Sequence, residues 1–170
     1  PVQSRLAAEV RVEHLRAGLD AAAGRALLGL DAELGAWRAR AGLPAEVPLV
    51  VVSKRGGRDL DAERLPSSTL ILTCEAGARA GSAPFEQLAC GIDDVDLRAG
   101  LALLASRGYR RLVCEGGPTL FGDLLEAGLV DELCLTLTPL LVGPAPGLLA
   151  ATPSRRPALR LLAMLRDEDV

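Results

Sequence analysis

The residues from Glu115 to Thr119 carry the clearest potential for chemistry in this sequence, which reads Glu-Gly-Gly-Pro-Thr at these positions. A carboxylate precedes two glycines, which permit positive φ and place no side chain between the backbone and a ligand. Pro118 suits the first position of a helix, because its missing N–H has no helical partner there. A helix N-terminus directs N–H groups and the positive end of the helix dipole at one place. The pattern therefore predicts an anion-binding turn.

Two short elements must hold this turn in place. The apolar run at 112–114 predicts a buried strand that ends just before Glu115. Residues 119–127 predict a helix after the turn, because Leu120 and Leu124 fall on one helical face. A glycine directly after this helix is placed to end it.

Two further strands are predicted at 48–53 and 69–73, where apolar and β-branched residues dominate. Strands that alternate with helices indicate an α/β fold with a mainly parallel sheet. In such sheets ligands bind at the carboxyl ends of the strands. Ser53, Thr73 and Glu115 all lie at predicted strand ends, so we expect these three residues to border one site.

The rest of the chain gives weaker signals. Residues 9–15 alternate as a strand would, but the same residues continued to position 26 also fit a helix, and both interpretations stay open. The other predicted elements are a helix at 31–40, a strand at 87–92, a helix from Asp93 or Asp94 to Ser106, an alternating edge or antiparallel strand at 132–138, and a last strand at 157–165.

Composition narrows the possible classes of protein. A chain of 170 residues with 49% hydrophobic residues suits a single globular domain over 1–170, in which 1–30 is a divergent N-terminal part. The net charge of −3 and the 2% of aromatic residues argue against nucleic-acid binding. The four cysteines match no zinc-binding spacing, so we expect no metal. No apolar run approaches the roughly 20 residues that cross a bilayer, and we expect a cytoplasmic protein with no membrane partner.

The sequence Val-Cys-Glu-Gly-Gly-Pro-Thr-Leu at 113–120, with Gly-Leu-Val-Asp-Glu-Leu-Cys-Leu-Thr-Leu-Thr-Pro at 128–139, closely resembles the riboflavin-biosynthesis pyrimidine reductase family. The resemblance covers residues 31–166. It implies a dihydrofolate-reductase-like fold, with a mainly parallel central sheet flanked by helices and antiparallel C-terminal strands. It also implies NADPH-dependent hydride transfer that reduces 5-amino-6-(5-phosphoribosylamino)uracil to its ribitylamino form, by an oxidoreductase that forms a homodimer.

The resemblance further implies roles for particular residues. Those placed against the NADPH cofactor are Gly116, Gly117, Pro118, Thr119 and Leu120, with main-chain N–H groups on the phosphates. Those placed near the adenosine end are Ser53, Lys54, Arg55 and Thr73, where a cation would pair with the 2′-phosphate. Glu115 is the first catalytic candidate, in contact with the substrate. Asp20 is the second, because Ala-Gly-Leu-Asp at 17–20 partly resembles the Ser-Leu-Asp-Gly motif of the family.

Other interpretations remain open at the same residues. Glu115 could cap the helix that follows it, and Lys54 and Arg55 could be solvated loop charges. The Gly-Thr-x-Arg turn of the family does not occur in this sequence. Alternative functions are therefore a non-catalytic module that binds NADPH or forms dimers, or a reductase of another pterin-like substrate.

Overall fold

The computed structural model describes residues 9–13, 32–42, 48–81, 83–115, 117–135, 137, 143, 147–154 and 158–164. Along these residues the elements are β1 (Glu9–Glu13), α2 (Ala32–Arg40), β2 (Leu49–Val52), the 3-10 helix η2 (Ala62–Arg64), β3 (Leu70–Thr73), α3 (Glu75–Arg79), β4 (Glu86–Ala89), α4 (Leu97–Ser106), β5 (Arg111–Cys114) and α5 (Pro118–Glu126). Asp20 and Gly116 lie outside the described residues.

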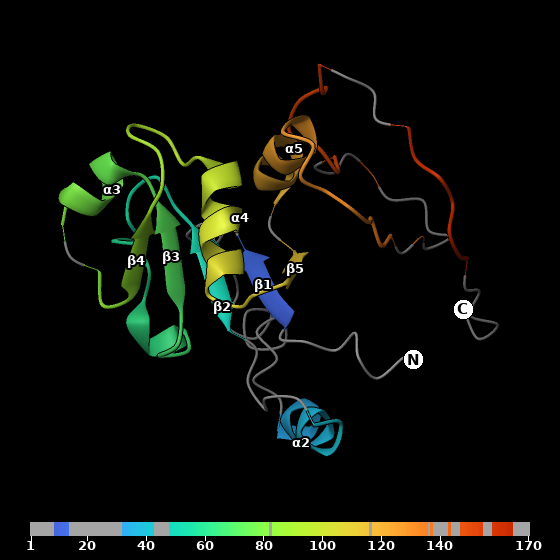
Figure 1. Cartoon of the computed structure of the whole chain (residues 1–170), viewed down its shortest axis with the longest axis horizontal. Coiled ribbons are helices and arrows are strands. Elements are labelled where there is room, and N and C mark those ends of the chain that lie inside the picture. The colour runs from blue at the N-terminus through green and yellow to red at the C-terminus, as the bar shows by residue number, and fades with distance from the viewer. Residues whose placement is uncertain are drawn as a thin grey trace.

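The five described strands form one sheet in the order β4-β3-β2-β1-β5. Every pairing between neighbours is parallel. In Figure 1 the carboxyl ends of the strands point toward the side of the sheet on which α3 and α5 lie, and α4 crosses one face. Parallel pairing therefore gathers the loops after β2, β3, β4 and β5 at one edge, as the sequence predicted.

Alternating residues of the central strands face two separate apolar clusters. On one face, Val50, Leu72 and Leu88 pack in a cluster with Leu104 of α4 and residues of α5. On the other face, a smaller cluster contains Leu49, Val51, Ile71 and Phe85. Both faces of β2 and β3 are thus buried, which explains their continuous apolar sequences.

The helix α4 approaches the sheet closely at Gly100. A Cβ atom at this position would lie 2.6 Å from Cδ2 of Leu72 and 3.1 Å from Sγ of Cys90. The helix begins after Asp96, whose carboxylate accepts a hydrogen bond from the Ala99 N–H at 2.9 Å. The prediction that Asp93 or Asp94 begins this helix was wrong, because Asp96 supplies the cap.

The structure also decides between the two interpretations of the N-terminal segment. β1 is a strand and lies between β2 and β5 in the sheet. The predicted helix at 31–40 is confirmed as α2, and the strand predicted at 87–92 is observed as β4, at Glu86–Ala89. Trp37 of α2 is 54% exposed, so it is not a core residue within this chain.

The two predicted C-terminal strands are not observed. Among the described residues of 132–138 and 157–165, none is assigned to a strand. Their large apolar side chains are mostly exposed, and Leu137 reaches 84%. The alternating pattern suggested pairing, but no described strand pairs with these residues, and β5 pairs only with β1 within the described sheet.

Candidate functional site

The N-terminus of α5 lies at the carboxyl edge of the sheet, directly after β5 and Glu115 (Figure 1). Pro118 occupies the start of the helix, and Gly117 at the N-cap makes no side-chain capping bond. The φ of Gly117 is −54°, so the positive φ that the sequence suggested is not used at this residue. The N–H groups in the first turn of a helix point out from its N-terminal end, where they can meet an anion.

Gly117 is not required by the local packing. A Cβ atom at this position would meet no heavy atom within 4 Å. Its φ is accessible to any residue, so among the described residues only the N-cap position itself favours a glycine here. The open space at this position leaves room for a ligand to approach the backbone.

The other predicted residues of this segment differ in exposure. Glu115 and Thr119 are exposed at the edge of the sheet. Leu120 is only 4% exposed and belongs to the core cluster with Leu104 and Leu124. The side chain of Leu120 therefore anchors α5, and only its main chain is available to a cofactor.

The loop after β2 carries Ser53, Lys54 and Arg55. Oγ of Ser53 accepts hydrogen bonds from the N–H groups of Arg55 and Gly57, both at 3.3 Å, and so shapes the loop. Arg55 pairs with Asp59 at 3.0 Å between Nη1 and Oδ2. The serine therefore has a structural role in this chain, while the guanidinium lies on the surface in an ion pair.

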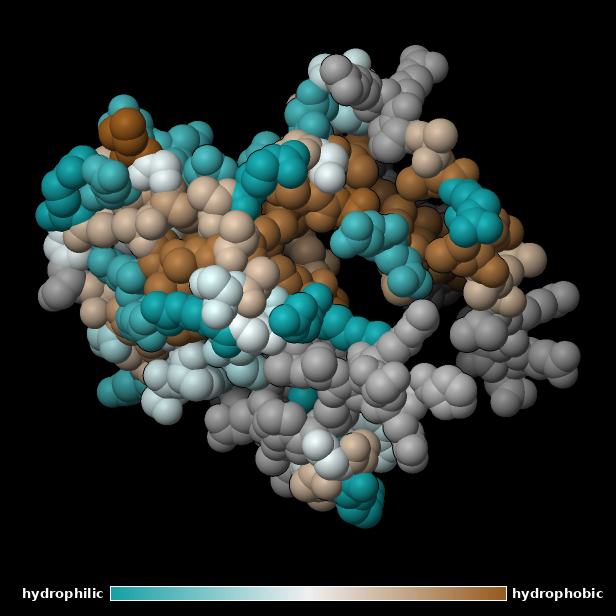
Figure 2. All heavy atoms as spheres, viewed as in Figure 1, coloured by the Kyte–Doolittle hydropathy of each residue, from teal (hydrophilic) through white to brown (hydrophobic). Residues whose placement is uncertain are grey.

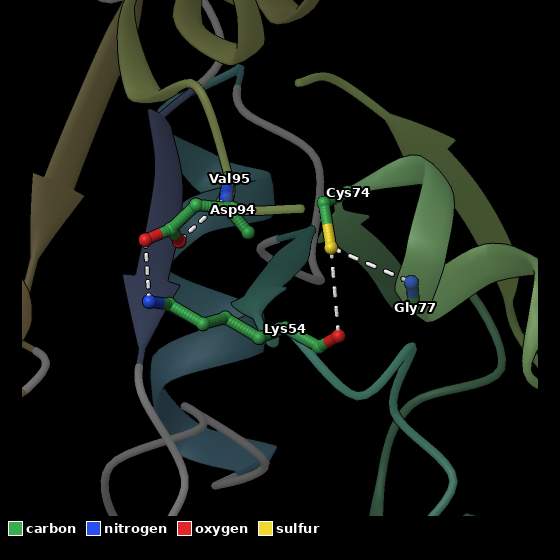
Figure 3. Close-up of polar contacts among 5 residues, drawn as sticks. All are labelled: Lys54, Cys74, Gly77, Asp94 and Val95. Atoms are coloured by element: carbon green, nitrogen blue, oxygen red, sulfur yellow. Dashed lines mark hydrogen bonds and ion pairs between the residues drawn. The ribbon is translucent and has the colours of Figure 1, made fainter. Parts of the chain in front are cut away.

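Lys54 pairs with Asp94, a residue that follows β4. The distance from Nζ of Lys54 to Oδ2 of Asp94 is 2.5 Å, and Figure 3 shows the two side chains meeting. The hydrogen bond from Lys54 holds the pKa of Asp94 below its usual range, and the same bond raises the pKa of Lys54. Asp123 of α5 also raises the pKa of Lys54 by charge attraction.

Thr73 ends β3, the strand that lies between β2 and β4. It is fully buried, and among the described residues its Oγ1 is a buried polar atom with no hydrogen-bond partner. A Cβ atom at Gly77 would lie 2.5 Å from this Oγ1 and 2.3 Å from the carbonyl oxygen of Lys54. The sequence placed Thr73 against a ligand, but in this structure its side chain faces the interior.

Cys74 joins the β2 loop to α3. Its thiol donates to the carbonyl oxygen of Lys54 at 3.6 Å, and Sγ accepts from the N–H of Gly77 at 3.4 Å (Figure 3). These contacts and its burial make Cys74 a packing residue. Cys90 is also buried, and burial raises the pKa of its thiol. A raised pKa disfavours the reactive thiolate form.

These features fit a phosphate-bearing nucleotide. The space beside Gly117 lies at a helix N-terminus, and Lys54 and Arg55 supply cations at the same edge of the sheet. Guanidinium and ammonium groups are suitable donors to phosphate oxygens. No group of three or more potential metal ligands occurs among the described residues. None of the described helices is long and apolar enough to span a bilayer.

Sequence reasoning missed Asp94 as a site residue. The neighbouring aspartates suggested only the start of a helix, and Asp94 is 40 residues from Lys54 in the sequence. The two residues follow strands that are not direct neighbours, because β3 lies between β2 and β4 in the sheet. No local signal could therefore have indicated the pair.

Residues 8–169 match the protein family described as RibD C-terminal domain. One similar protein is the 2,5-diamino-6-ribosylamino-4(3H)-pyrimidinone 5′-phosphate reductase of Methanothermobacter thermautotrophicus, 37% identical over 93 residues, which covers 47% of this chain and 43% of the relative. The protein of the same name from Archaeoglobus fulgidus is 42% identical over 53 residues, covering 31% of this chain and 24% of the relative. Both matches thus span less than half of the relative.

A crystal structure of a pyrimidine reductase-like protein from Corynebacterium diphtheriae has a similar fold. The TM-score is 0.50, with 21% sequence identity, over 81% of this chain and 60% of that chain. At this identity the likeness concerns the fold alone. It agrees with the α/β architecture and the parallel sheet.

Proposed function

The chain belongs to the RibD C-terminal domain family, and from this premise we propose that it is an NADPH-dependent reductase of riboflavin biosynthesis. Its substrate would be 5-amino-6-(5-phosphoribosylamino)uracil, which is reduced to the ribitylamino form. The observation that carries the proposal is the glycine N-cap of α5 beside Glu115, with open space where a side chain would lie. This arrangement suits the phosphates of a dinucleotide.

The residues of the chain would divide the work of binding and positioning. When bound, NADPH supplies the hydride. The N–H groups at the start of α5 would hold its phosphates, and Gly117 would allow the close approach. Lys54 and Arg55 would offer cations to the 2′-phosphate at the adenosine end. Glu115 would orient the substrate at the end of β5, so that the carbon to be reduced faces the cofactor.

The two candidate substrates differ in the pyrimidine ring. The two similar archaeal reductases are named for a 2,5-diaminopyrimidinone. That ring carries an amino group where the uracil has a carbonyl, while both substrates share the phosphoribosylamino side chain. Since the reaction takes place on this shared side chain, we extend the proposal to both substrates as competitors for one site.

Consumption of NADPH by the purified chain with each pyrimidine tests this function. We expect oxidation of NADPH that depends on a phosphoribosylamino-pyrimidine and forms the ribitylamino product. NADPH binding without turnover of either substrate would favour the alternative, a non-catalytic binding module. Turnover of another pterin-like substrate in place of both would favour the other alternative.

We also propose that the chain acts as a homodimer in the cytoplasm. Within the described residues, exposed leucines and a methionine at 158–164 and apolar side chains at 135 and 137 remain uncovered. Figure 2 shows hydrophobic surface around α5 and the C-terminal segment. Burial of this surface in a second copy would stabilise both chains. The four cysteines of the chain are free thiols, which suits a reducing compartment such as the cytoplasm. Sedimentation equilibrium, which would give one or two chains per particle, tests the dimer.

A further inference from the structure

The ion pair between Lys54 and Asp94 bridges the end of an intervening strand. Lys54 follows β2 and Asp94 follows β4, while β3 lies between those two strands in the sheet. Neighbouring strands are about 4.8 Å apart, so the two side chains reach across about two strand spacings. Nζ and Oδ2 meet at 2.5 Å, in the part of the site shown in Figure 3.

The backbone beneath this bridge is held in place from both sides. On the β2 side, the Ser53 N–H donates to the carbonyl oxygen of Leu72 at 2.9 Å. On the β4 side, the Glu75 N–H donates to the carbonyl oxygen of Gly91, also at 2.9 Å. The β2 loop is thus tied to β3, and the β4 loop is tied to the first residue of α3. The two charged side chains are each 65% exposed and can move without a change in the backbone.

Asp94 is the more fixed of the two partners. Its Oδ1 accepts a hydrogen bond from the Val95 N–H at 2.7 Å, which orients the carboxylate independently of Lys54. Lys54 reaches the carboxylate through a long flexible side chain. The carboxylate therefore keeps an orienting contact of its own, and the ammonium can leave it for another anion.

We propose that Asp94 is a specificity-determining residue that competes with the phosphate of a nicotinamide nucleotide for Lys54. The inference rests on the proposed function, because it takes NADPH as the ligand at this edge of the sheet. A phosphate that binds Lys54 must displace Asp94 or lie beside it, and either arrangement weakens its binding. NADH has no 2′-phosphate and does not meet this competition. Asp94 thus lowers the preference for NADPH over NADH.

Calorimetric titration of NADPH and NADH into four proteins tests the proposal without a measurement of activity. The proteins are the wild type, Asp94→Asn, Lys54→Met and the double variant. We expect Asp94→Asn to tighten NADPH binding about three- to fivefold, the upper part of the range for an exposed ion pair. The same variant should change NADH affinity by less than about twofold. Lys54→Met should weaken NADPH binding, and Asp94→Asn should add nothing in the Lys54→Met background.

A matched control separates this competition from a general change in charge. Glu86→Gln also removes one exposed carboxylate from an ion pair, with Arg107, but Glu86 begins β4 at the opposite edge of the sheet. This variant should bind both nucleotides as the wild type does. The gain in Asp94→Asn should shrink at high salt, because ions screen exposed charges.

Two results would overturn the proposal. Asp94→Asn could leave the ratio of NADPH to NADH affinity unchanged, or it could tighten NADPH binding equally when Lys54 is absent. A failure of the proposed function gives a different result. If Asp94→Asn shifts NADPH affinity as expected but the chain turns over no pyrimidine, the competition is supported and the proposed reductase function is contradicted. Binding of neither nucleotide by any of the four proteins contradicts both.

Discussion

Val12 of β1 and Cys114 of β5 are register partners in the parallel pairing of these two strands. Glu13 ends β1, and Glu115 directly follows the end of β5. Because β1 lies between β2 and β5, the strand that leads to α5 is paired with an interior strand of the described sheet. Ligands of open α/β sheets bind at the carboxyl ends of the strands, so this pairing positions the proposed cofactor and substrate contacts.

Replacement of Glu115 by Gln tests its role with the substrate. Gln keeps the size of the side chain but loses the negative charge. If the carboxylate of Glu115 orients the substrate or transfers a proton, the variant should lose that function. We expect kcat to fall by about 100-fold, with NADPH affinity within about twofold of the wild type. Steady-state kinetics and calorimetry measure the two effects. Glu132→Gln, at an exposed glutamate beyond α5, serves as the control, and a normal kcat in Glu115→Gln would remove the residue from the catalytic site.

Replacement of Gly77 by Ala tests the packing of α3 under the β2 loop. The new Cβ would lie 2.3 Å from the carbonyl oxygen of Lys54, which the backbone cannot easily relieve. We expect the free energy of unfolding in urea to fall by about 1–3 kcal/mol. Gly122→Ala is the matched control, because Gly122 lies within α5 and an added Cβ there would meet no heavy atom within 4 Å. It should raise stability by up to about 1 kcal/mol, and a loss of equal size in both variants would contradict the described packing.

The pairing of Lys54 with Asp94 predicts a small pH dependence of stability. Because the hydrogen bond to Lys54 lowers the pKa of Asp94 in the folded state, the stabilisation is present above the ordinary carboxyl pKa of about 4. It is lost as the pH falls through the lowered value, and lost again at high pH through the raised pKa of Lys54. Both groups are exposed, so the effect is below about 1 kcal/mol at neutral pH.

Urea unfolding of the wild type and of Asp94→Asn over a range of pH measures this effect. The stability difference should favour the wild type near pH 7 and vanish in acid. A difference that stays constant down to acidic pH would show that the carboxylate charge is not its source.

Much of the fold could be predicted because its signals are local. β2 and β3 are continuous apolar runs, since both of their faces are buried, and α5 has proline at its start. The ambiguity of β1 had a physical reason, because its residues fit two periodicities. Only its pairing with β2 and β5, which come much later in the chain, decides for a strand.

The candidate site divides in the same way. Residues 115–120 could be predicted because glycine and proline at fixed spacing form a local pattern. This part of the prediction concerns a single turn. The burial of Thr73 depends on α3 packing against β3, and the Asp94 contact depends on strand order. Neither is encoded by neighbouring residues. The alternating C-terminal runs misled for a related reason, because a strand needs a partner edge as well as a pattern.

NADPH binding by the Gly117→Val variant tests the central claim most directly. The φ of Gly117 and the open space at its Cβ position indicate that valine leaves the fold intact, and circular dichroism checks this. The wild type should bind NADPH with an affinity of about micromolar order, and Gly122→Ala should bind equally well. We predict that Gly117→Val weakens binding by at least about tenfold, because its side chain fills the space that the cofactor needs. An unchanged affinity in a folded Gly117→Val protein would contradict a cofactor site at the N-terminus of α5.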